Sequence, residues 1–192
     1  MSEVLRGRYT ARSASEHVVF LIGMRINDVL AVSSWLPAAR AMPRMMAELA
    51  ARPELGMLHS ESFFGWRTFF FVQYWESFEK LERFARSRDL PHVPAWREFN
   101  QRVGTSGKVG IFHETYVVRG DRSESIYANM PRFGLGRAFE HVPVAVRGQS
   151  AGKRVGARPT DEPGEPVCEI SRRDDRSKLA RGEMPSFFKK WI

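Results

Sequence analysis

The sequence contains very little cysteine: its one cysteine, Cys168, lies in a polar segment near the C-terminus. One cysteine excludes an internal disulfide and a metal cluster held by cysteines, and it fits a reducing compartment. Long apolar runs are also missing, since no stretch approaches the roughly 18 uninterrupted apolar residues of a membrane helix. Residues 1–16 lack the apolar core of a signal peptide. These absences predict a cytoplasmic protein without a membrane span.

Motifs that would indicate a metal, a nucleotide or an activated serine are missing as well. No pair of histidines or carboxylates has the spacing of zinc ligands, and no Gly-x-Ser-x-Gly sequence marks a nucleophile elbow. The glycine-rich sequence at Gly134 follows no predicted strand, which argues against dinucleotide binding. The sequence therefore predicts no metal site.

The charge balance is basic, with a formal net charge of +8 and a pI near 10.1. Such a charge can indicate nucleic-acid binding. However, much of the excess lies in residues 145–192, which are rich in polar residues, glycine and proline, and the rest is scattered along the chain. We therefore expect no nucleic-acid partner.

The most apolar and aromatic stretch of the chain runs from Met57 to Glu76. It predicts two strands, residues 58–64 and 67–75, joined by a turn at Gly65 and Trp66. Alternation in the second strand would place Thr68, Phe70, Val72 and Tyr74 on one face and Arg67, Phe69, Phe71, Gln73 and Trp75 on the other. Both faces are largely apolar, so we expect both to be covered.

The flanking segments complete a recognisable order of elements. Further strands are predicted at residues 17–27 and 109–118, and helices from Trp35 to just before Pro53, capped by Ser33 or Ser34, and from residue 78 to about 88. Pro43 should kink or restart the first of these helices, and another helical piece should begin at Pro94. The order strand, helix, strand, strand, helix, strand predicts an α+β fold of the ferredoxin-like type over residues 17–120. Because the sheet face without helices is also apolar, we expect homodimerisation into a dimeric α+β barrel.

Three segments lie outside this domain. Residues 1–16 are predicted to be a flexible N-terminus. Residues 121–144 mix turn residues with apolar side chains and should form an arm that packs on the core. Residues 145–192 are too polar to bury much surface and are interpreted as a basic tail of low order.

Several sequence blocks together resemble a family classed as monooxygenase-like, which is related to the antibiotic-biosynthesis type of monooxygenase. The blocks are FLIGMRIN, WLPAARAMPRMMAEL, residues 62–86, HVPAWREFN, GIFHETY and IYANMPRFGLG, within about residues 16–143. The resemblance implies a dimeric α+β barrel with a pocket for a small-molecule substrate between sheet and helices. It also implies oxygenation without metal or flavin, in which the substrate itself activates dioxygen.

Chemistry of this kind needs a proton acceptor, and histidine is the usual one. The first candidate is His113, which shares a predicted strand face with Ile111, Thr115 and Val117; the alternative is a core histidine bonded to a backbone carbonyl. The second is His92, which could instead be an exposed loop histidine. Arg67 is the third candidate catalytic residue, as a stabiliser of developing negative charge.

Six further residues are candidates for substrate binding: Arg25, Trp66, Tyr74, Trp96, Tyr127 and Asn129. An arginine in a β-rich apolar region either pairs with a carboxylate, here Glu61 or Glu114, or faces a ligand. Trp96 could equally be a core residue, and Tyr127 with Asn129 would reach a pocket only if the arm folds over it.

Two other functions stay open from the sequence. One is a haem-binding barrel with a histidine as axial ligand, although no cofactor is the leading expectation. The other is a dimer that binds a ligand without catalysis. The fold alone does not separate these, because function resides in the site.

Overall fold

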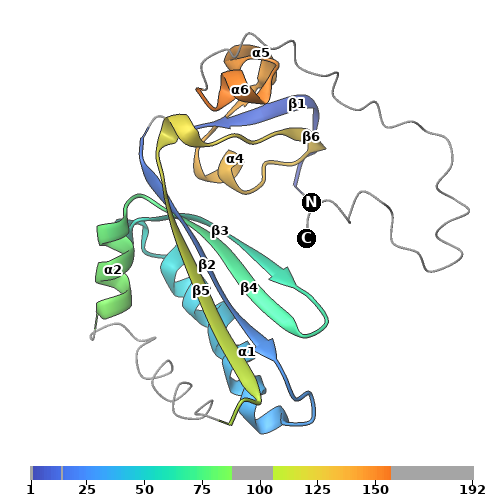
Figure 1. The fold of residues 1–192 in the computed structure, drawn as a ribbon, viewed down its shortest axis with the longest axis vertical. Coiled ribbons are helices and arrows are strands. Elements are labelled where there is room, and N and C mark those ends of the chain that lie inside the picture. Colours follow the sequence, from blue (N-terminus) through green and yellow to red (C-terminus); the bar gives the residue numbers. More distant parts are fainter. Residues whose placement is uncertain (1, 14, 88–105, 157–192) are drawn as a thin grey trace, which may run out of the picture. The chain divides into compact units, whose positions relative to one another are not determined.

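A computed structural model describes residues 2–13, 15–87 and 106–156 of the chain (Figure 1). Within these ranges, no helix is both long enough and apolar enough to span a membrane.

The larger of two sheets has four antiparallel strands, in the order β3-β4-β2-β5. The strands are β2 (His17–Ile26), β3 (Met57–Phe64), β4 (Thr68–Trp75) and β5 (Val109–Val118). β2 comes first of these four in the chain and pairs with both β4, the third, and β5, the fourth, as in ferredoxin-like sheets. The predicted α+β fold class is thus confirmed. We call this the main sheet.

Two of the described helices pack on this sheet: α1 (Val32–Ala50) and α2 (Phe78–Arg86). A short 3-10 turn, η1 (Pro53–Leu55), lies between α1 and β3 in the chain. Ser77 caps α2 as predicted, because its side chain accepts a hydrogen bond from the Lys80 amide. The predicted cap of α1 was wrong: Ala31 is the N-cap and no side chain caps the helix. The helix also continues through Pro43. The helical piece predicted from Pro94 lies outside the described residues.

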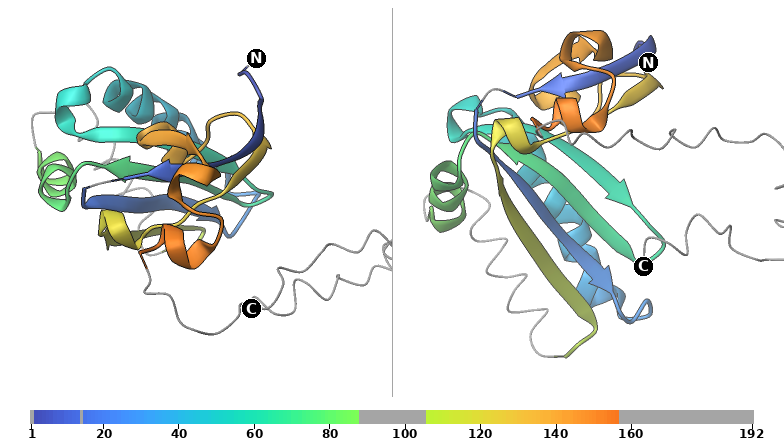
Figure 2. Two further views of the ribbon diagram at one scale, coloured as in Figure 1. Left: turned by 90° about the horizontal axis from the view of Figure 1, so that it is seen from above. Right: turned by 45° about the horizontal axis from the view of Figure 1, so that its top comes forward.

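The core lies between the main sheet and these helices. Figure 2 shows α1 running along one face of the sheet. Two apolar clusters fill this layer, one around Met24, Ile26 and Val109 and the other around Val18, Leu49, Trp75 and Leu81. The strand register confirms the predicted faces of β4, since Phe71, Gln73 and Trp75 are all buried on the helix side.

The opposite face of the main sheet, which we call the open face, is also apolar. Its members come from three neighbouring strands and are half-buried: Val19, Leu21, Phe70, Val72 and Phe112. None of the helices α1 and α2 packs on them. One end of this face is contacted by the segment after β6, where the Phe133 ring meets the Phe63 ring edge-on at 6.2 Å. Among the described residues, the helices α1 and α2 leave the rest of this face uncovered.

A second, three-stranded sheet has the order β6-β1-β7 and is antiparallel throughout. Its strands are β1 (Leu5–Arg12), β6 (Tyr127–Met130) and β7 (Glu140–Pro143), accompanied by η2 (Gly120–Arg122) and α4 (Leu135–Ala138). The expectation of a flexible N-terminus over residues 1–16 was therefore wrong for residues 5–12. This segment is the central strand, and Thr10 and Ala11 in it are buried.

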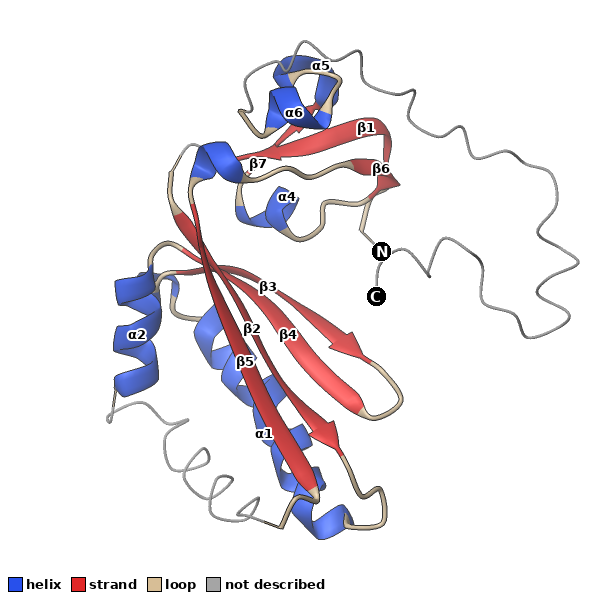
Figure 3. Ribbon diagram, viewed as in Figure 1, coloured by secondary structure: helices blue, strands red, loops and turns tan. Residues whose placement is uncertain are grey.

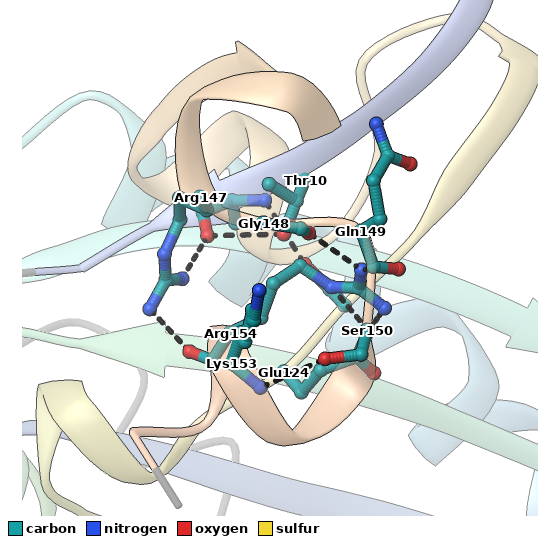
Figure 4. A network of polar contacts seen from close by, with 10 residues as sticks. Thr10, Glu124, Arg147, Gly148, Gln149, Ser150, Lys153 and Arg154 are labelled. Carbon is teal, nitrogen blue, oxygen red and sulfur yellow. Dashed lines mark hydrogen bonds and ion pairs between the residues drawn. The ribbon is translucent and has the colours of Figure 1, made fainter. Parts of the chain in front are cut away.

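The predicted low-order tail was also placed too early. Residues 144–156 form two short helices, α5 (Val144–Arg147) and α6 (Ala151–Arg154), and the Arg154 side chain is only 4% exposed. Its guanidinium donates to the Glu124 carboxylate (Figure 4). It also donates to the Gly148 carbonyl at 3.0 Å and to the Gln149 carbonyl at 2.8 Å. Arg147 joins the same network by donating to the Ala11 carbonyl on β1, at 2.6 Å. The part of the tail from residue 157 lies outside the described residues.

His17, at the start of β2, predicts a pH dependence of stability. The side chain is fully buried, its Nδ1 lies 3.2 Å from the Ser13 hydroxyl, and its Nε2 has no partner among the described residues. Burial lowers the pKa of His17 below its ordinary value. The unfolded chain then binds more protons than the native chain, so stability should fall as the pH drops below about 6.5 towards the folded-state pKa.

The measurement is Tm as a function of pH for the wild type and for His17→Phe, which keeps the packing against Phe139 but removes the titrating group. The variant should lose less Tm between pH 7 and pH 5.5, values chosen to span the ordinary histidine pKa of about 6.5. Equal losses in the two proteins would contradict this assignment.

Candidate functional site

A cavity of about 310 Å³ lies between the main sheet and α2. Most of its lining is apolar and comes from β2, α1 and α2: Phe20, Ile22, Met45, Phe78, Leu81, Phe84 and Ala85. Four polar side chains complete it: Gln73, Glu82, His113 and Thr115. Its size and its mostly apolar lining with a few polar groups are typical of small-molecule sites, which range from roughly 300 to 1,000 Å³.

His113 stands at the rim of this cavity. The register pairs it with Ile22, so its side chain points to the helix side of the sheet, as alternation predicted. Its ring lies 5.9 Å from the Phe20 ring, centroid to centroid. The side chain is nevertheless exposed, because β5 is an edge strand, so the alternative of a buried core histidine was wrong. An exposed imidazole beside an apolar cavity can exchange protons with solvent while it contacts a bound molecule.

Two polar side chains of the cavity are paired with neighbours. Gln73 is buried; its Oε1 accepts from the Trp75 indole at 2.9 Å and its Nε2 donates to the Met46 sulfur at 3.3 Å. Glu82 pairs with Arg86 on the next turn of α2, at 2.8 Å. Gln73 is therefore fixed before any ligand arrives, whereas Glu82 belongs to an exposed ion pair. Thr115 is exposed on β5 and is the other polar side chain that the sheet offers to a ligand.

A second polar cluster lies on the other side of the main sheet, where the open face meets the second sheet. The His59 Nε2 lies 2.9 Å from a Glu61 carboxylate oxygen, and the same oxygen accepts the Gly134 amide at 3.1 Å. The Tyr74 ring stacks near His59, and burial, followed by the charges of Tyr127 and Glu61, raises the pKa of Tyr74 to about 12. Tyr74 is thus a neutral hydroxyl at neutral pH.

This cluster contains two predicted site residues, Tyr74 and Tyr127, which the structure brings together. Tyr127 accepts the Gly136 amide through its hydroxyl at 3.2 Å, so it is engaged with the second sheet. Sequence reasoning missed the His59–Glu61 pair and assigned Glu61 to an arginine instead. The spacing of two residues was the available signal, since side chains at i and i+2 of a strand share a face.

Other predicted residues lie elsewhere. Arg25, Trp66 and Arg67 are at the far end of the main sheet and do not line the cavity. Arg67 donates to the Asn27 carbonyl at 2.6 Å, and neither Glu61 nor Glu114 is its partner. Asn129 belongs to β6, where its side-chain oxygen accepts the Gly7 amide at 3.0 Å.

Glu114, the other carboxylate predicted as a possible partner of an arginine, instead accepts a hydrogen bond from the Tyr116 hydroxyl. His92 and Trp96 lie outside the described residues. Among the residues that the structure does describe, no group of three or more histidine, cysteine or acidic side chains is arranged to hold a metal.

A family model and a curated relative both assign the chain to the same protein family. The sequence model described as "Monooxygenase af470-like" matches residues 17–135. Monooxygenase af470 from Aspergillus fumigatus is 30% identical over 159 residues, which cover 71% of this chain and 56% of that protein. This chain therefore spans little more than half the length of that curated relative.

Two solved structures are similar to this chain, and the one with the higher TM-score shows the shared fold. Aldoxime dehydratase OxdRE in complex with butyraldoxime superposes with a TM-score of 0.53 at 17% identity, over 68% of this chain and 39% of that chain. SnoaB, a cofactor-independent oxygenase from Streptomyces nogalater, gives a TM-score of 0.38 at 16% identity, over 55% of this chain and 95% of that chain. At such low identity, the first likeness concerns the fold alone.

Proposed function

Because the chain belongs to the monooxygenase af470-like family, we propose that it oxygenates a small organic molecule bound in the cavity between the main sheet and α2. The observation that carries this proposal is the cavity itself: a mostly apolar space lined by the exposed imidazole of His113 and by the buried, hydrogen-bonded side chain of Gln73. An electron-rich molecule with an acidic C–H or O–H group would suit it, since aromatic and aliphatic walls would hold the carbon skeleton.

In the proposed reaction, His113 accepts the acidic proton and the resulting anion reacts with dioxygen. Conversion of a CH₂ group to a carbonyl supplies four electrons, so one O₂ yields the carbonyl oxygen and one water without a separate reductant. The apolar walls keep bulk water away from the anion and its oxygen adduct. Gln73 and Thr115 are positioned to hydrogen-bond an oxygen of the substrate.

The test is oxygen uptake with a panel of electron-rich phenols and enolisable ketones, followed by product identification. On any substrate that is turned over, His113→Ala should lower kcat/KM about a hundredfold, the lower end of the effect of general-base removal. His59→Gln is the matched control, because it removes a histidine from the opposite face of the same sheet; its kcat/KM should stay close to the wild-type value.

A loss in His59→Gln with none in His113→Ala would contradict the proposal and point to the cluster around Tyr74. Binding without turnover would support a non-catalytic ligand-binding dimer. A Soret band that appears on haem addition and depends on His113 would support the haem alternative.

We also propose that two copies of the chain pair through their open faces. The support is the row of apolar side chains on β2, β4 and β5 that neither α1 nor α2 covers. Burying such a face against an identical one removes both from water and gives a closed two-fold assembly.

A further inference from the structure

The three most exposed large apolar side chains of the described residues lie at one end of the main sheet. Trp66 is 91% exposed, Leu30 87% and Phe64 68%, whereas no other large apolar side chain in the described ranges exceeds 58%. Trp66 lies in the turn between β3 and β4, Phe64 is the last residue of β3, and Leu30 belongs to the loop between β2 and α1. The Ile26 amide donates to the Arg67 carbonyl at 2.7 Å, so the two loops start side by side (Figure 3). With the partly exposed Val29 and Val32, we call these residues the apolar tip.

Several polar groups of the two loops are paired within the protein. The Gly65 amide donates to the Thr68 carbonyl at 2.8 Å and closes the turn. In the other loop, Asp28 accepts the Leu30 amide at 3.0 Å, and the Trp35 indole donates to the Val29 carbonyl at 3.1 Å. Because these backbone groups keep their hydrogen bonds, they lower the cost of inserting the apolar side chains of the two loops into an apolar phase.

Basic side chains surround the apolar tip. Arg25 and Lys108 are exposed, and the Lys108 carbonyl accepts the amides of Asn27 and Asp28, which places this lysine beside the loop. Arg67 adds a third cation, and Asp28 is the acidic side chain in the same loop. The local charge is therefore positive, like that of the whole chain at +8. Aromatic and aliphatic side chains ringed by Lys and Arg match the interface of an anionic bilayer, where rings settle at headgroup level and cations meet lipid phosphates.

We propose that the apolar tip is a docking site for an anionic membrane surface. Side chains as exposed as Trp66 and Leu30 suit a lipid layer, which deforms around inserted side chains, better than a flat partner protein. The cations provide the charge complementarity to anionic headgroups. This role is independent of the reaction at the cavity, since no residue of the apolar tip lines it.

The experiment is co-sedimentation of the full chain with vesicles of phosphatidylcholine, with and without phosphatidylserine. The wild type should sediment with the anionic vesicles and remain in solution with the neutral ones. Trp66→Ser combined with Leu30→Ser should weaken binding about tenfold or more, as expected for two large side chains that no longer insert. Arg25→Ser combined with Lys108→Ser should also weaken it and reduce its dependence on salt.

Two controls match these variants. Val146→Ser removes an apolar side chain that is 58% exposed on α5, and Arg83→Ser removes an exposed cation on α2; both should bind vesicles like the wild type. Absence of wild-type binding, or equal binding by the tip variants and the controls, would overturn the proposal. A lower Tm or a change of oligomeric state in Trp66→Ser would overturn it too, by showing that another segment or a second copy covers the apolar tip.

Discussion

Arg154→Ala should lower the free energy of unfolding by about 3 kcal/mol, because it breaks a buried ion pair and leaves its partners unpaired. In the native chain, the guanidinium reaches Glu124 and two backbone carbonyls, and the Arg154 carbonyl in turn accepts from Arg147 at 2.6 Å. This value is at the lower end of the range for breaking a buried ion pair, because Glu124 is 27% exposed and water can hydrate it once the arginine is removed. Urea unfolding followed by circular dichroism measures the change.

Lys153→Ala is the matched control for Arg154→Ala, because the Lys153 side chain is exposed on the same helix. Its removal should lower the free energy of unfolding by less than about 0.5 kcal/mol. Arg154→Lys should be intermediate, since an ammonium group cannot reproduce the forked geometry of the guanidinium. If Arg154→Ala and Lys153→Ala were equally stable, residues 144–156 would not be anchored to the second sheet through this arginine.

Leu21→Asp should convert the proposed dimer into a monomer. Leu21 lies on β2 at the middle of the open face, opposite Val72 on β4. Burying an unpaired carboxylate in the proposed interface costs at least about 3 kcal/mol, which weakens association roughly a hundredfold or more. Sedimentation velocity at micromolar concentration measures the dimer fraction.

Val117→Asp is the control for Leu21→Asp. It adds the same charge to the neighbouring strand but on the helix side, where Val117 is 54% exposed, so the dimer should survive. A monomeric wild type, or a dimer that tolerates Leu21→Asp, would show that the open faces do not pair.

The main sheet was predictable because its strands carry their own signals. Residues 109–118 form β5 with the expected ends, and β2, β3, β4 and α2 start or end within two residues of the predicted bounds. Each of these segments has strong apolar periodicity and a clear turn or cap at its ends. The register then places each side chain on the face that alternation assigned to it.

The second sheet could not be predicted in the same way. β1 reads LRGRYTAR, with three arginines and a glycine. It is a strand because Tyr127–Met130 and Glu140–Pro143 pair with it from more than one hundred residues away. The burial of Arg154 has the same cause, since its partner Glu124 is thirty residues distant. Pairings of this kind depend on tertiary context, which overrides local propensity.

The candidate site was predictable only in part for a related reason. Alternation gives the face of His113 but not its exposure, which depends on β5 being an edge strand. From the sequence, the neighbouring Trp66 and Arg67 were predicted to bind a ligand. The structure places both at the far end of the main sheet, away from the cavity. His59 and Glu61 were the reverse case, a pair visible in the sequence at a spacing of two.

The most direct test of the central claim is a crystal structure with a substrate or product identified in the oxygen-uptake screen. The molecule should lie in the cavity between the main sheet and α2, in contact with His113 and with Gln73 or Thr115. A molecule bound instead on the open face, beside Tyr74 and His59, would contradict it.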